Sequence, residues 1–319
     1  MSGRVHAQMS AVVVDGEGAP VLGRIGRPRP RAGELHARVR LVGLCGSDSE
    51  KLGDGRLEHV VLGHEIVAET IAGSGLAGRR VVILHRVECG ACEECLTGHA
   101  PMCRQYLASG LRPGGFAEEV VASAAHVERA VLPVPAHVTD AEAVLTEPLG
   151  CVLRALERLP AGRHRVVGGG IMGQLAVRAL VARGDVVEIA EPEDAREALA
   201  LAAGAVRAGG TVDADGAFVT VPDGLAAALR ALRVGGTAVV FAAGEEPLPV
   251  DLDLIYRREL VLRGARSTDS ASLRGALAAI AAGRIDVRGL VTHELPLDRF
   301  DEGLSLYRSG RALKVAFRP

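Results

Sequence analysis

Hydrophobic residues follow two different spacings along the chain. Up to about residue 135, short Val/Leu-rich runs alternate with glycine- and proline-rich turns, which predicts β-strands with irregular connections. The predicted strands are residues 11–14, 35–41, 60–62, 66–71, 80–84 and 117–122. The first part of the chain is therefore expected to be rich in β-structure.

Helical spacing begins near residue 139. Thr139 with Glu142 three residues later forms a capping box, and Pro148 predicts a break before residues 151–159 resume the helical period. Glu147 lies just before that break, in an otherwise apolar stretch. A carboxylate there costs free energy unless it is paired or binds a metal. The alternative is an exposed glutamate at a helix end.

A glycine motif follows from residue 165 onward. Gly168, Gly170 and Gly173 form G-x-G-x-x-G between a short strand and a helix, and the next strand, residues 185–190, ends at Glu191. In this context the glycines let a pyrophosphate approach the helix N-terminus, and the acid binds ribose hydroxyls. The predicted cofactor-binding residues are Gly168, Gly170, Ile171, Met172, Gly173 and Glu191. Because Glu191 would repel a 2′-phosphate, NAD is predicted over NADP; the alternative is an ordinary βαβ unit that binds no nucleotide.

The remaining residues alternate between helical and strand patterns. Helices are predicted at 194–203, 224–232 and 270–282, and strands at 217–221, 237–241 and 260–264, which is typical of a doubly wound α/β domain. Residues 206–216 are too short and glycine-rich for a crossover helix, so a compact loop is predicted there. From residue 291 a strand, a helix over 298–308 and a closing strand over 314–317 are predicted.

Length and charge limit the possible partners. A chain of 319 residues can form two domains, and 48% hydrophobic residues with a formal net charge of -2 indicate a globular protein. Nothing in this charge calls for nucleic acid or an anionic membrane as a partner. The first ten residues lack an apolar signal core, and no apolar run approaches the ~20 residues of a membrane span. A cytoplasmic protein is therefore expected.

Four of the six cysteines are closely clustered. Cys89, Cys92, Cys95 and Cys103 have the spacing C-x2-C-x2-C-x7-C. Four thiolates on a short segment can close a tetrahedral shell around a structural zinc ion. Unliganded thiols and an iron–sulfur cluster are the alternatives.

A second set of possible ligands precedes this cluster. Cys45 lies in a glycine-flanked turn followed by Ser47 and Asp48, and His64 and Glu65 follow an apolar run. A thiolate and an imidazole suit Zn²⁺, with a carboxylate as a further ligand. Taken alone, such a pair is more often a core or surface feature, so its weight depends on the other motifs.

Together these motifs resemble the zinc-dependent medium-chain dehydrogenase/reductase superfamily over essentially the full chain. The matching motifs are GLCGSD at 43–48, GHE at 63–65, the four-cysteine lobe, EPL at 147–149 and the glycine turn at 168–173. The EPL motif resembles the polyol, sugar and threonine dehydrogenase branch. The resemblance implies an α/β fold, with a GroES-like β-rich catalytic domain at 1–150 and 290–319. It also implies a structural zinc lobe at 86–105 and a Rossmann NAD-binding domain at 151–289.

The resemblance also implies roles for individual residues. Cys45 and His64 would bind a catalytic zinc, and Glu65 and Glu147 would compete for the remaining protein position. Cys151, one helical turn beyond Glu147, is an outside candidate and is more readily explained as a buried structural cysteine. Such a zinc acts as a Lewis acid on the substrate hydroxyl while a hydride passes to the nicotinamide. Ser47 is the expected proton relay, with Asp48 orienting the site.

Three features depart from the family pattern. Glu50 stands where a histidine often completes the proton relay, so a carboxylate carries the relay or the proton takes another route. His59 stands where a proline often precedes GHE, and we interpret it as a surface residue. The missing crossover helix after Ala205 shortens the nucleotide domain on its adenine side.

The functional hypothesis is an NAD- and zinc-dependent dehydrogenase of a secondary alcohol on a polyol, sugar or aminocyclitol. It would act on a small molecule as a homodimer or homotetramer. An aldehyde or ketone reductase of the same superfamily and a catalytically silent nucleotide-binding homologue are the alternatives. A zinc-finger protein that binds nucleic acid is disfavoured, because no basic face accompanies the cysteines.

Overall fold

The structure, a computed structural model, describes residues 7–53, 57–73, 75–210, 213–244 and 247–319. The chain forms two compact units: residues 1–147, 269–281 and 287–319, and residues 148–268 and 282–286. This division places α11 (Ser270–Ala281) in the first unit, whereas the sequence ended the nucleotide domain at residue 289. Among the described residues, no helix is long and apolar enough to cross a membrane.

The first unit is built on a seven-stranded sheet. Its strands run in the order β14-β15-β3-β4-β5-β7, with β6 paired to β3, and β1 and β2 form a separate two-stranded ribbon that is bridged to this unit at Ala11 and Ala117. The strands are β1 (Gln8–Val14), β2 (Pro20–Gly26), β3 (Leu35–Gly43), β4 (Glu65–Ala72), β5 (Arg80–Leu84), β6 (Glu119–Ala122), β7 (Val131–Pro133), β14 (His293–Pro296) and β15 (Val315–Arg318). The predicted strand at 60–62 does not form; the Val60 and Leu62 carbonyls instead accept isolated hydrogen bonds from the N–H groups of Val14, at the end of β1, and Phe116.

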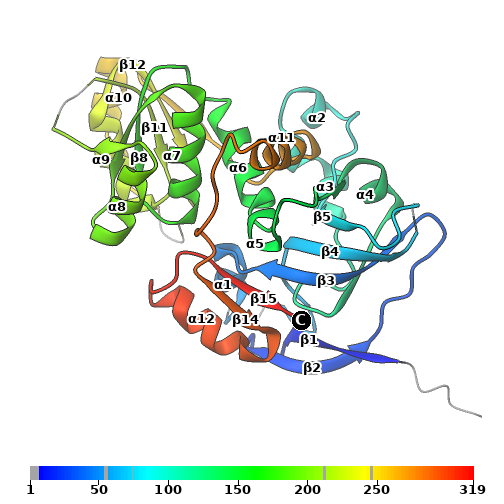
Figure 1. Ribbon diagram of the computed structural model, residues 1–319. Coiled ribbons are helices and arrows are strands. Elements are labelled where there is room, and N and C mark those ends of the chain that lie inside the picture. The colour runs from blue at the N-terminus through cyan, green and yellow to red at the C-terminus, as the bar shows by residue number, and fades with distance from the viewer. Residues whose placement is uncertain (1–6, 54–56, 74, 211–212, 245–246) are drawn as a thin grey trace, which may run out of the picture. The chain divides into compact units, whose positions relative to one another are not determined.

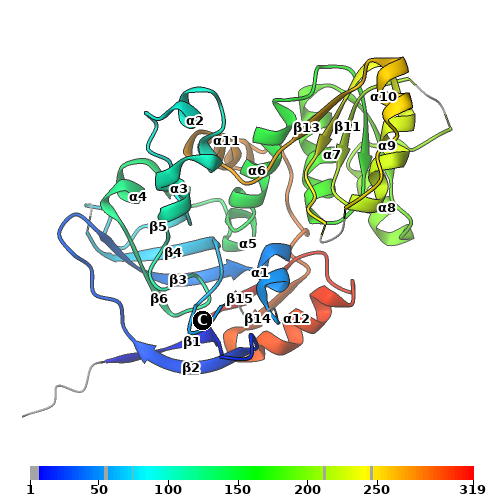
Figure 2. The same cartoon turned by 180° about the vertical axis from the view of Figure 1, so that it is seen from behind.

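Short helices connect these strands. They are α1 (Gly46–Lys51), α2 (Glu93–Leu96), α3 (Arg104–Ala108), α4 (Ala124–Arg129), α5 (Asp140–Ala143) and α12 (Phe300–Arg308), with 3-10 turns at Ala100–Met102 and Leu297–Arg299. Figures 1 and 2 show α12 beside β14 and β15, where Phe300 stacks on Phe317 in the core. Arg308 ties α12 to α1 by donating to the Ser49 hydroxyl at 3.0 Å.

The predicted capping box is present at the start of α5. The Thr139 hydroxyl accepts from the Glu142 N–H, and the Glu142 carboxylate accepts from the Thr139 N–H. Helix α6 (Thr146–Leu156) then begins before Pro148, so the predicted break at Pro148 is wrong. Proline fits the first turn of a helix because its missing N–H has no intrahelical partner there.

The second unit is a parallel sheet of six strands in the order β10-β9-β8-β11-β12-β13. Its strands are β8 (Arg163–Val167), β9 (Val186–Ala190), β10 (Val206–Arg207), β11 (Ala214–Val219), β12 (Leu232–Val240) and β13 (Val261–Gly264). Its helices are α7 (Ile171–Arg183), α8 (Asp194–Ala202), α9 (Leu225–Ala231) and α10 (Leu252–Arg258), with a 3-10 turn at Pro222–Gly224. Figures 1 and 2 show α7 and α9 on opposite sides of β11.

This strand order is that of a dinucleotide-binding doubly wound sheet. The predicted α/β class, a β-rich unit joined to a parallel-sheet unit, is therefore confirmed. No helix lies between β10 and β11 in the described residues there, which exclude 211–212, as the short glycine-rich segment predicted. Helix α10 and strands β2 and β10 were not predicted.

Asp140 connects three strands of the first unit. Its side chain, 8% exposed, accepts from Arg40 on β3 at 3.0 Å and from Arg80 on β5 at 2.8 Å, and Arg318 on β15 lies 3.7 Å away. Burial alone would raise the pKa of Asp140, but the hydrogen bonds and charges of the first two arginines outweigh it and hold this pKa below its usual value.

Replacing Asp140 with asparagine is expected to lower the free energy of unfolding by about 2 kcal/mol at pH 7, a modest value because the arginines are partly exposed. Because the pKa of Asp140 is lower in the folded than in the unfolded protein, its ionised carboxylate stabilises the fold above the unfolded pKa of about 4. This stabilisation is lost as pH falls through the folded-state pKa. Urea unfolding from pH 7 to 3.5 should thus show the difference from wild type shrinking below about pH 4. A difference independent of pH, or an equal loss in the exposed control Asp301→Asn, would contradict this role.

Candidate metal centre and nucleotide turn

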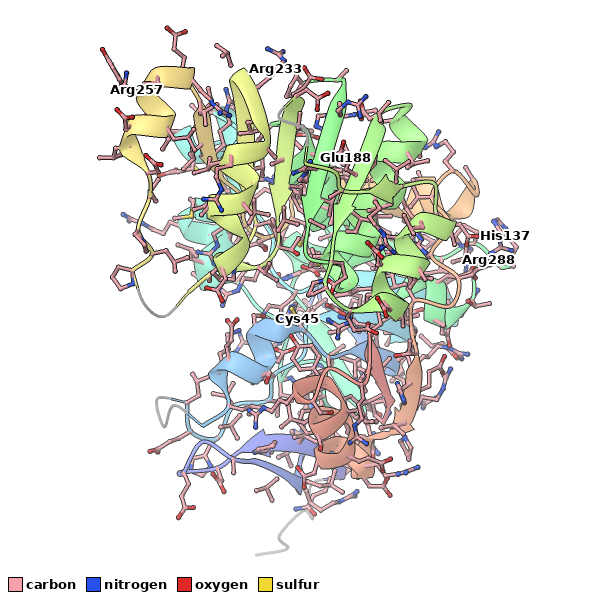
Figure 3. All side chains as sticks on the ribbon, turned by 90° about the vertical axis from the view of Figure 1, so that its left-hand side faces the viewer. Cys45, His137, Glu188, Arg233, Arg257 and Arg288 are labelled. Carbon is pink, nitrogen blue, oxygen red and sulfur yellow. The ribbon has the colours of Figure 1, made fainter. Side chains whose placement is uncertain are left out.

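Cys45 lies at the N-cap of α1, directly after β3 (Figure 3). Its backbone N–H donates to Asp48 Oδ2 at 3.2 Å, and its carbonyl accepts from the Asp48 and Ser49 N–H groups. These bonds fix the turn that carries the thiol. The Ser47 hydroxyl donates to Cys45 Sγ at 3.5 Å, so the predicted relay hydroxyl lies beside the predicted metal ligand.

Asp48 links Cys45 to His64. Its side chain is 1% exposed, and its Oδ1 accepts from His64 Nδ1 at 3.2 Å and from the Gly63 N–H at 3.4 Å. Burial alone would raise the pKa of Asp48, but the charge of His64 and its hydrogen bond outweigh burial and hold this pKa below its usual value. A carboxylate on Nδ1 fixes the histidine tautomer and leaves Nε2 as the nitrogen available to a metal. The structure thus places Asp48 where the predicted orienting role requires it.

Glu65 and Lys314 form a fully buried ion pair. Their side chains are 1% and 2% exposed, and Lys314 Nζ lies 2.5 Å from each carboxylate oxygen of Glu65 while also donating to the Leu44 carbonyl at 2.9 Å. The hydrogen bond runs to Oε1, and buried Oε2 has no hydrogen-bond partner in the described part of the chain. Both carboxylate oxygens therefore lie at ion-pair distance from the ammonium, and a metal at Glu65 would share the carboxylate with Lys314.

Three of the predicted catalytic-zinc ligands come together. One donor atom each from Cys45, His64 and Glu65 lies within 4.8 Å of the others. Zinc bonds of about 2.0–2.3 Å place donors roughly 3–4 Å apart. A small inward shift would thus let this sulfur, nitrogen and oxygen set hold a zinc ion.

Glu147, the alternative zinc ligand, and Glu50, the predicted relay carboxylate, lie outside this group of donors. Glu147, 7% exposed in the first turn of α6, is not in the group of donors that could hold a metal, and its charge contributes to the raised pKa of Lys314. It stays a predicted alternative ligand. Glu50, in the last part of α1, is exposed, so its carboxylate is open to solvent. His59 is also exposed, as predicted, with a left-handed backbone at φ 58°.

The four-cysteine lobe has its donors in place. All four sulfur atoms lie within 4.8 Å of one another, with Cys92 and Cys95 Sγ at 3.5 Å and Cys89 and Cys95 Sγ at 3.9 Å. Tetrahedral Zn–S bonds of about 2.3 Å give sulfur separations of about 3.8 Å. Backbone N–H groups of Ala91 and Cys92 donate to Cys89 Sγ and lower the pKa of that thiol to about 6, which favours the thiolate. The lobe fits a structural zinc ion.

The glycine turn has the form that a pyrophosphate requires. Gly168 has φ +94°, and a Cβ on Gly173 would lie 1.8 Å from the Gly168 carbonyl oxygen, so neither position accepts a side chain. At Gly170, the N-cap of the 13-residue α7, a Cβ would meet nothing within 4 Å, so the space before the helix N-terminus is open. The residues therefore fit a bound dinucleotide phosphate.

Glu191 lies against this turn. Its carboxylate accepts from the Gly169 N–H and, through Oε1, from the Glu193 N–H at 2.9 Å. The predicted acid of β9 is thus held beside the phosphate-binding glycines, where a cofactor ribose is expected. Ile171 and Met172, also predicted to contact the cofactor, form the first turn of α7.

Sequence reasoning missed two residues near the metal centre, the buried Lys314 and the half-buried His85. Lys314 is one of only two lysines and precedes the apolar residues Val315, Ala316 and Phe317 of the closing strand, which was the available signal for a buried ion pair. His85 directly follows the buried strand β5 and precedes the cysteine lobe by four residues, but its type alone gave no signal.

Comparisons with known proteins agree with this geometry. Residues 31–136 match the alcohol dehydrogenase GroES-like domain. The chain is 30% identical over 301 residues to 2-dehydro-3-deoxy-L-galactonate 5-dehydrogenase of Pseudoalteromonas atlantica, covering 84% of this chain and 86% of that protein. It is 32% identical over 295 residues to D-altritol 5-dehydrogenase of Agrobacterium fabrum, covering 83% and 86%.

The fold is shared as well. The crystal structure of L-idonate 5-dehydrogenase from Escherichia coli has a TM-score of 0.84 to this chain at 22% identity, covering 98% of this chain and 99% of that one. The chain belongs to the zinc-dependent medium-chain dehydrogenase/reductase family of alcohol dehydrogenase-like enzymes. It is an oxidoreductase of the dehydrogenase type.

Proposed function

We propose that this protein oxidises a secondary alcohol of a polyol, sugar or aminocyclitol, with NAD as the hydride acceptor and zinc as the catalytic metal. The observation that carries the proposal is the convergence of Cys45, His64 and Glu65 donors within 4.8 Å, in a chain whose relatives include a D-altritol and a sugar-acid dehydrogenase. The test is NADH formation over a panel of polyols, aminocyclitols, sugars and threonine. NADH formed from polyols or sugars supports it, and a zinc-loaded enzyme that oxidises none of them contradicts it.

Cys45 Sγ and His64 Nε2 would hold the catalytic zinc, with Glu65 as the third protein ligand and Glu147 as the alternative. When bound there, zinc supplies Lewis-acid polarisation of the substrate oxygen. Asp48 keeps the His64 ring in the orientation that presents Nε2. The four cysteines of the lobe would hold a second, structural zinc.

Side chains of α1 would transfer the proton of the substrate hydroxyl to solvent. Ser47, whose hydroxyl donates to the Cys45 sulfur, would hydrogen-bond the reacting hydroxyl, take up its proton and pass its own proton outward. The exposed Glu50 carboxylate on the same helix is the candidate acceptor farther out, in the place where relatives often carry histidine. The proton then leaves to solvent.

The glycine turn would bind the cofactor pyrophosphate at the N-terminus of α7, and Glu191 would accept hydrogen bonds from the adenosine ribose hydroxyls. A carboxylate at this position repels the additional phosphate of NADP. The cofactor is therefore NAD.

Replacing Glu191 with alanine is expected to raise kcat/KM for NADP relative to NAD by roughly tenfold or more, because the charge that repels the 2′-phosphate is removed. Initial rates with both cofactors measure this ratio. Glu193→Gln, which neutralises a neighbouring acid, should change the ratio much less. A wild-type enzyme that already prefers NADP would refute the cofactor assignment.

Localisation and assembly complete the proposal. The six cysteines are free in the structure, which suits the reducing cytoplasm.

The outer strand β13 of the parallel sheet carries the partly exposed Val261 and Leu262, and this edge supports a homodimer or homotetramer. The proposed partner in catalysis is a small alcohol or ketone, with no role for nucleic acid or membrane.

A further inference from the structure

Helix α12 of the first unit is packed tightly onto β15. Gly303 has no side chain, and a Cβ there would overlap the Phe317 ring, so the helix lies directly on the strand. Phe300 stacks on the same ring with the two centroids 4.9 Å apart, and Leu304 is buried in the same core cluster. Close packing of this kind leaves α12 little freedom to shift.

The last turns of α12 lie against α1, the helix that carries Ser47 and Asp48 (Figures 2 and 3). A Cβ on Gly46 would lie 2.7 Å from the Tyr307 hydroxyl oxygen and 3.8 Å from the ring carbon that bears this hydroxyl. The hydroxyl therefore occupies the space that a side chain at position 46 would need. Glycine at this position lets the two helices meet.

Arg308 binds the other end of α1. Its Nε donates to the Ser49 hydroxyl at 3.0 Å, and its Nη2 donates to the Ser49 carbonyl at 3.1 Å. A guanidinium at a helix C-terminus also interacts favourably with the last carbonyl groups. On the other side of the turn, the Leu44 N–H donates to the Val315 carbonyl at 2.9 Å. Helix α12 and strand β15 therefore hold residues 44–49 at the start, at Gly46 and at the end.

Two functional side chains depend on where α1 lies. The Ser47 hydroxyl reaches Cys45 Sγ at 3.5 Å, and Asp48 Oδ1 accepts from His64 Nδ1 at 3.2 Å. Cys45 directly follows β3 and His64 directly precedes β4, whereas Ser47 and Asp48 belong to α1. A shift of α1 relative to these strands changes both contacts, and a displacement of about 1 Å breaks the Asp48–His64 hydrogen bond.

We propose that Tyr307 and Arg308 are positioning residues, which hold α1 where Ser47 takes up the substrate proton and Asp48 orients His64. The effect on turnover rests on the proposed function, whereas the contacts themselves lie within the first unit. Displacing α1 should slow the chemical step. It should leave NAD binding unchanged, because the glycine turn belongs to the second unit.

The test introduces a steric clash and then removes it. Gly46 is helical with an ordinary negative φ, so Gly46→Ala adds only a methyl group, which meets the Tyr307 hydroxyl and pushes α1 away. We expect kcat to fall by about tenfold or more, with the KM for NAD changed by less than about twofold. In Gly46→Ala/Tyr307→Phe the nearest ring atom is 3.8 Å from the methyl carbon, so most of the activity should return. No return of activity would overturn the proposal, since damage of any other kind is not relieved by removing the hydroxyl.

Arg308→Met removes both hydrogen bonds to Ser49. It should lower kcat by about threefold and raise the solvent deuterium isotope effect on kcat, because proton transfer becomes the slower step. Arg311→Met is the matched control, an exposed arginine of the same segment that donates to the Ser309 hydroxyl, and should keep both values. An unchanged kcat, or a lower kcat with an unchanged isotope effect, would contradict the role of Arg308.

Crystal structures of the variants give a readout that needs no turnover. The distance from Asp48 Oδ1 to His64 Nδ1, 3.2 Å in the wild-type protein, should exceed about 3.5 Å in Gly46→Ala and return in the double variant. A wild-type position of α1 in Gly46→Ala would overturn the proposal. If the wild-type enzyme oxidises no polyol or sugar, the proposed function fails, and this distance still decides whether α12 positions α1. Should Gly46→Ala not fold, Arg308→Met carries the same comparison.

Discussion

Replacing Cys45 with serine is expected to remove one of two zinc ions and to lower kcat/KM by about a thousandfold or more, while the fold survives. The thiolate is the softest donor of the Cys45–His64–Glu65 group, and a serine hydroxyl is a poor zinc ligand at neutral pH. Loss of metal removes several kcal/mol of transition-state stabilisation. The bonds that fix the turn run through the Cys45 backbone and Asp48, so they remain in the variant.

Zinc per chain, NAD reduction and circular dichroism measure the three parts of this prediction. The structural ion should stay, because its four cysteines lie in a separate lobe. Cys151→Ala is the matched control: Cys151 is a buried cysteine of α6 and should keep both ions and the activity. Full activity in a Cys45→Ser protein that holds only one zinc would contradict the mechanism.

Replacing Lys314 with methionine is expected to lower the free energy of unfolding by about 3–5 kcal/mol. The change leaves the Glu65 carboxylate buried without its ammonium partner, and Lys314 is 2% exposed, so water cannot replace the lost interaction. Lys51→Met is the natural control, since Lys51 is the other lysine of the chain and is exposed on α1. It should change stability by at most about 0.5 kcal/mol.

A double-mutant cycle isolates this ion pair. Glu65→Gln in the Lys314→Met background removes the uncompensated charge and should recover most of the lost stability. Urea unfolding followed by circular dichroism suits a protein with no tryptophan. Losses that simply add in the double variant would show that Lys314 and Glu65 do not stabilise each other.

The sequence predicted most elements that carry a sustained hydrophobic pattern or that have clear start and stop residues. Helix α7 was recognisable because Gly170 and Gly184 bound it, and strand β9 because it follows Gly184 and stops before Glu191. Helix α12 and strand β15 were recognisable because a helical pattern is followed there by a strand pattern. Elements with weak local signals were missed. Strand β2 contains two glycines and is largely exposed, so its pairing with β1 rather than its own pattern makes it a strand.

The Pro148 boundary shows a different limit. Proline predicts a break, but whether it ends one helix or begins the next depends on which N–H groups already lack partners. Helix α6 starts at Thr146, so Pro148 falls in its first turn. Local sequence rules cannot make that choice, because it depends on where the preceding α5 stops.

At the site, motif spacing predicted that Cys45 and His64 come together and that the four cysteines of the lobe cluster. Cysteine and histidine at these spacings are uncommon outside metal sites, so the residue types themselves carry the signal. The partners of those ligands could not be predicted in the same way. Lys314 reaches Glu65 across 249 residues of chain, and His85 lies beside His64 only because β4 and β5 are adjacent strands. Such contacts depend on sheet register, which one sequence does not encode in a local pattern.

Anomalous X-ray scattering at the zinc absorption edge, from crystals of protein purified with zinc, tests the central claim most directly. The account predicts two peaks per chain: one bound by the sulfur atoms of Cys89, Cys92, Cys95 and Cys103, and one bound by Cys45 Sγ and His64 Nε2. A single peak in the cysteine lobe, with none between Cys45 and His64 in active enzyme, would contradict it.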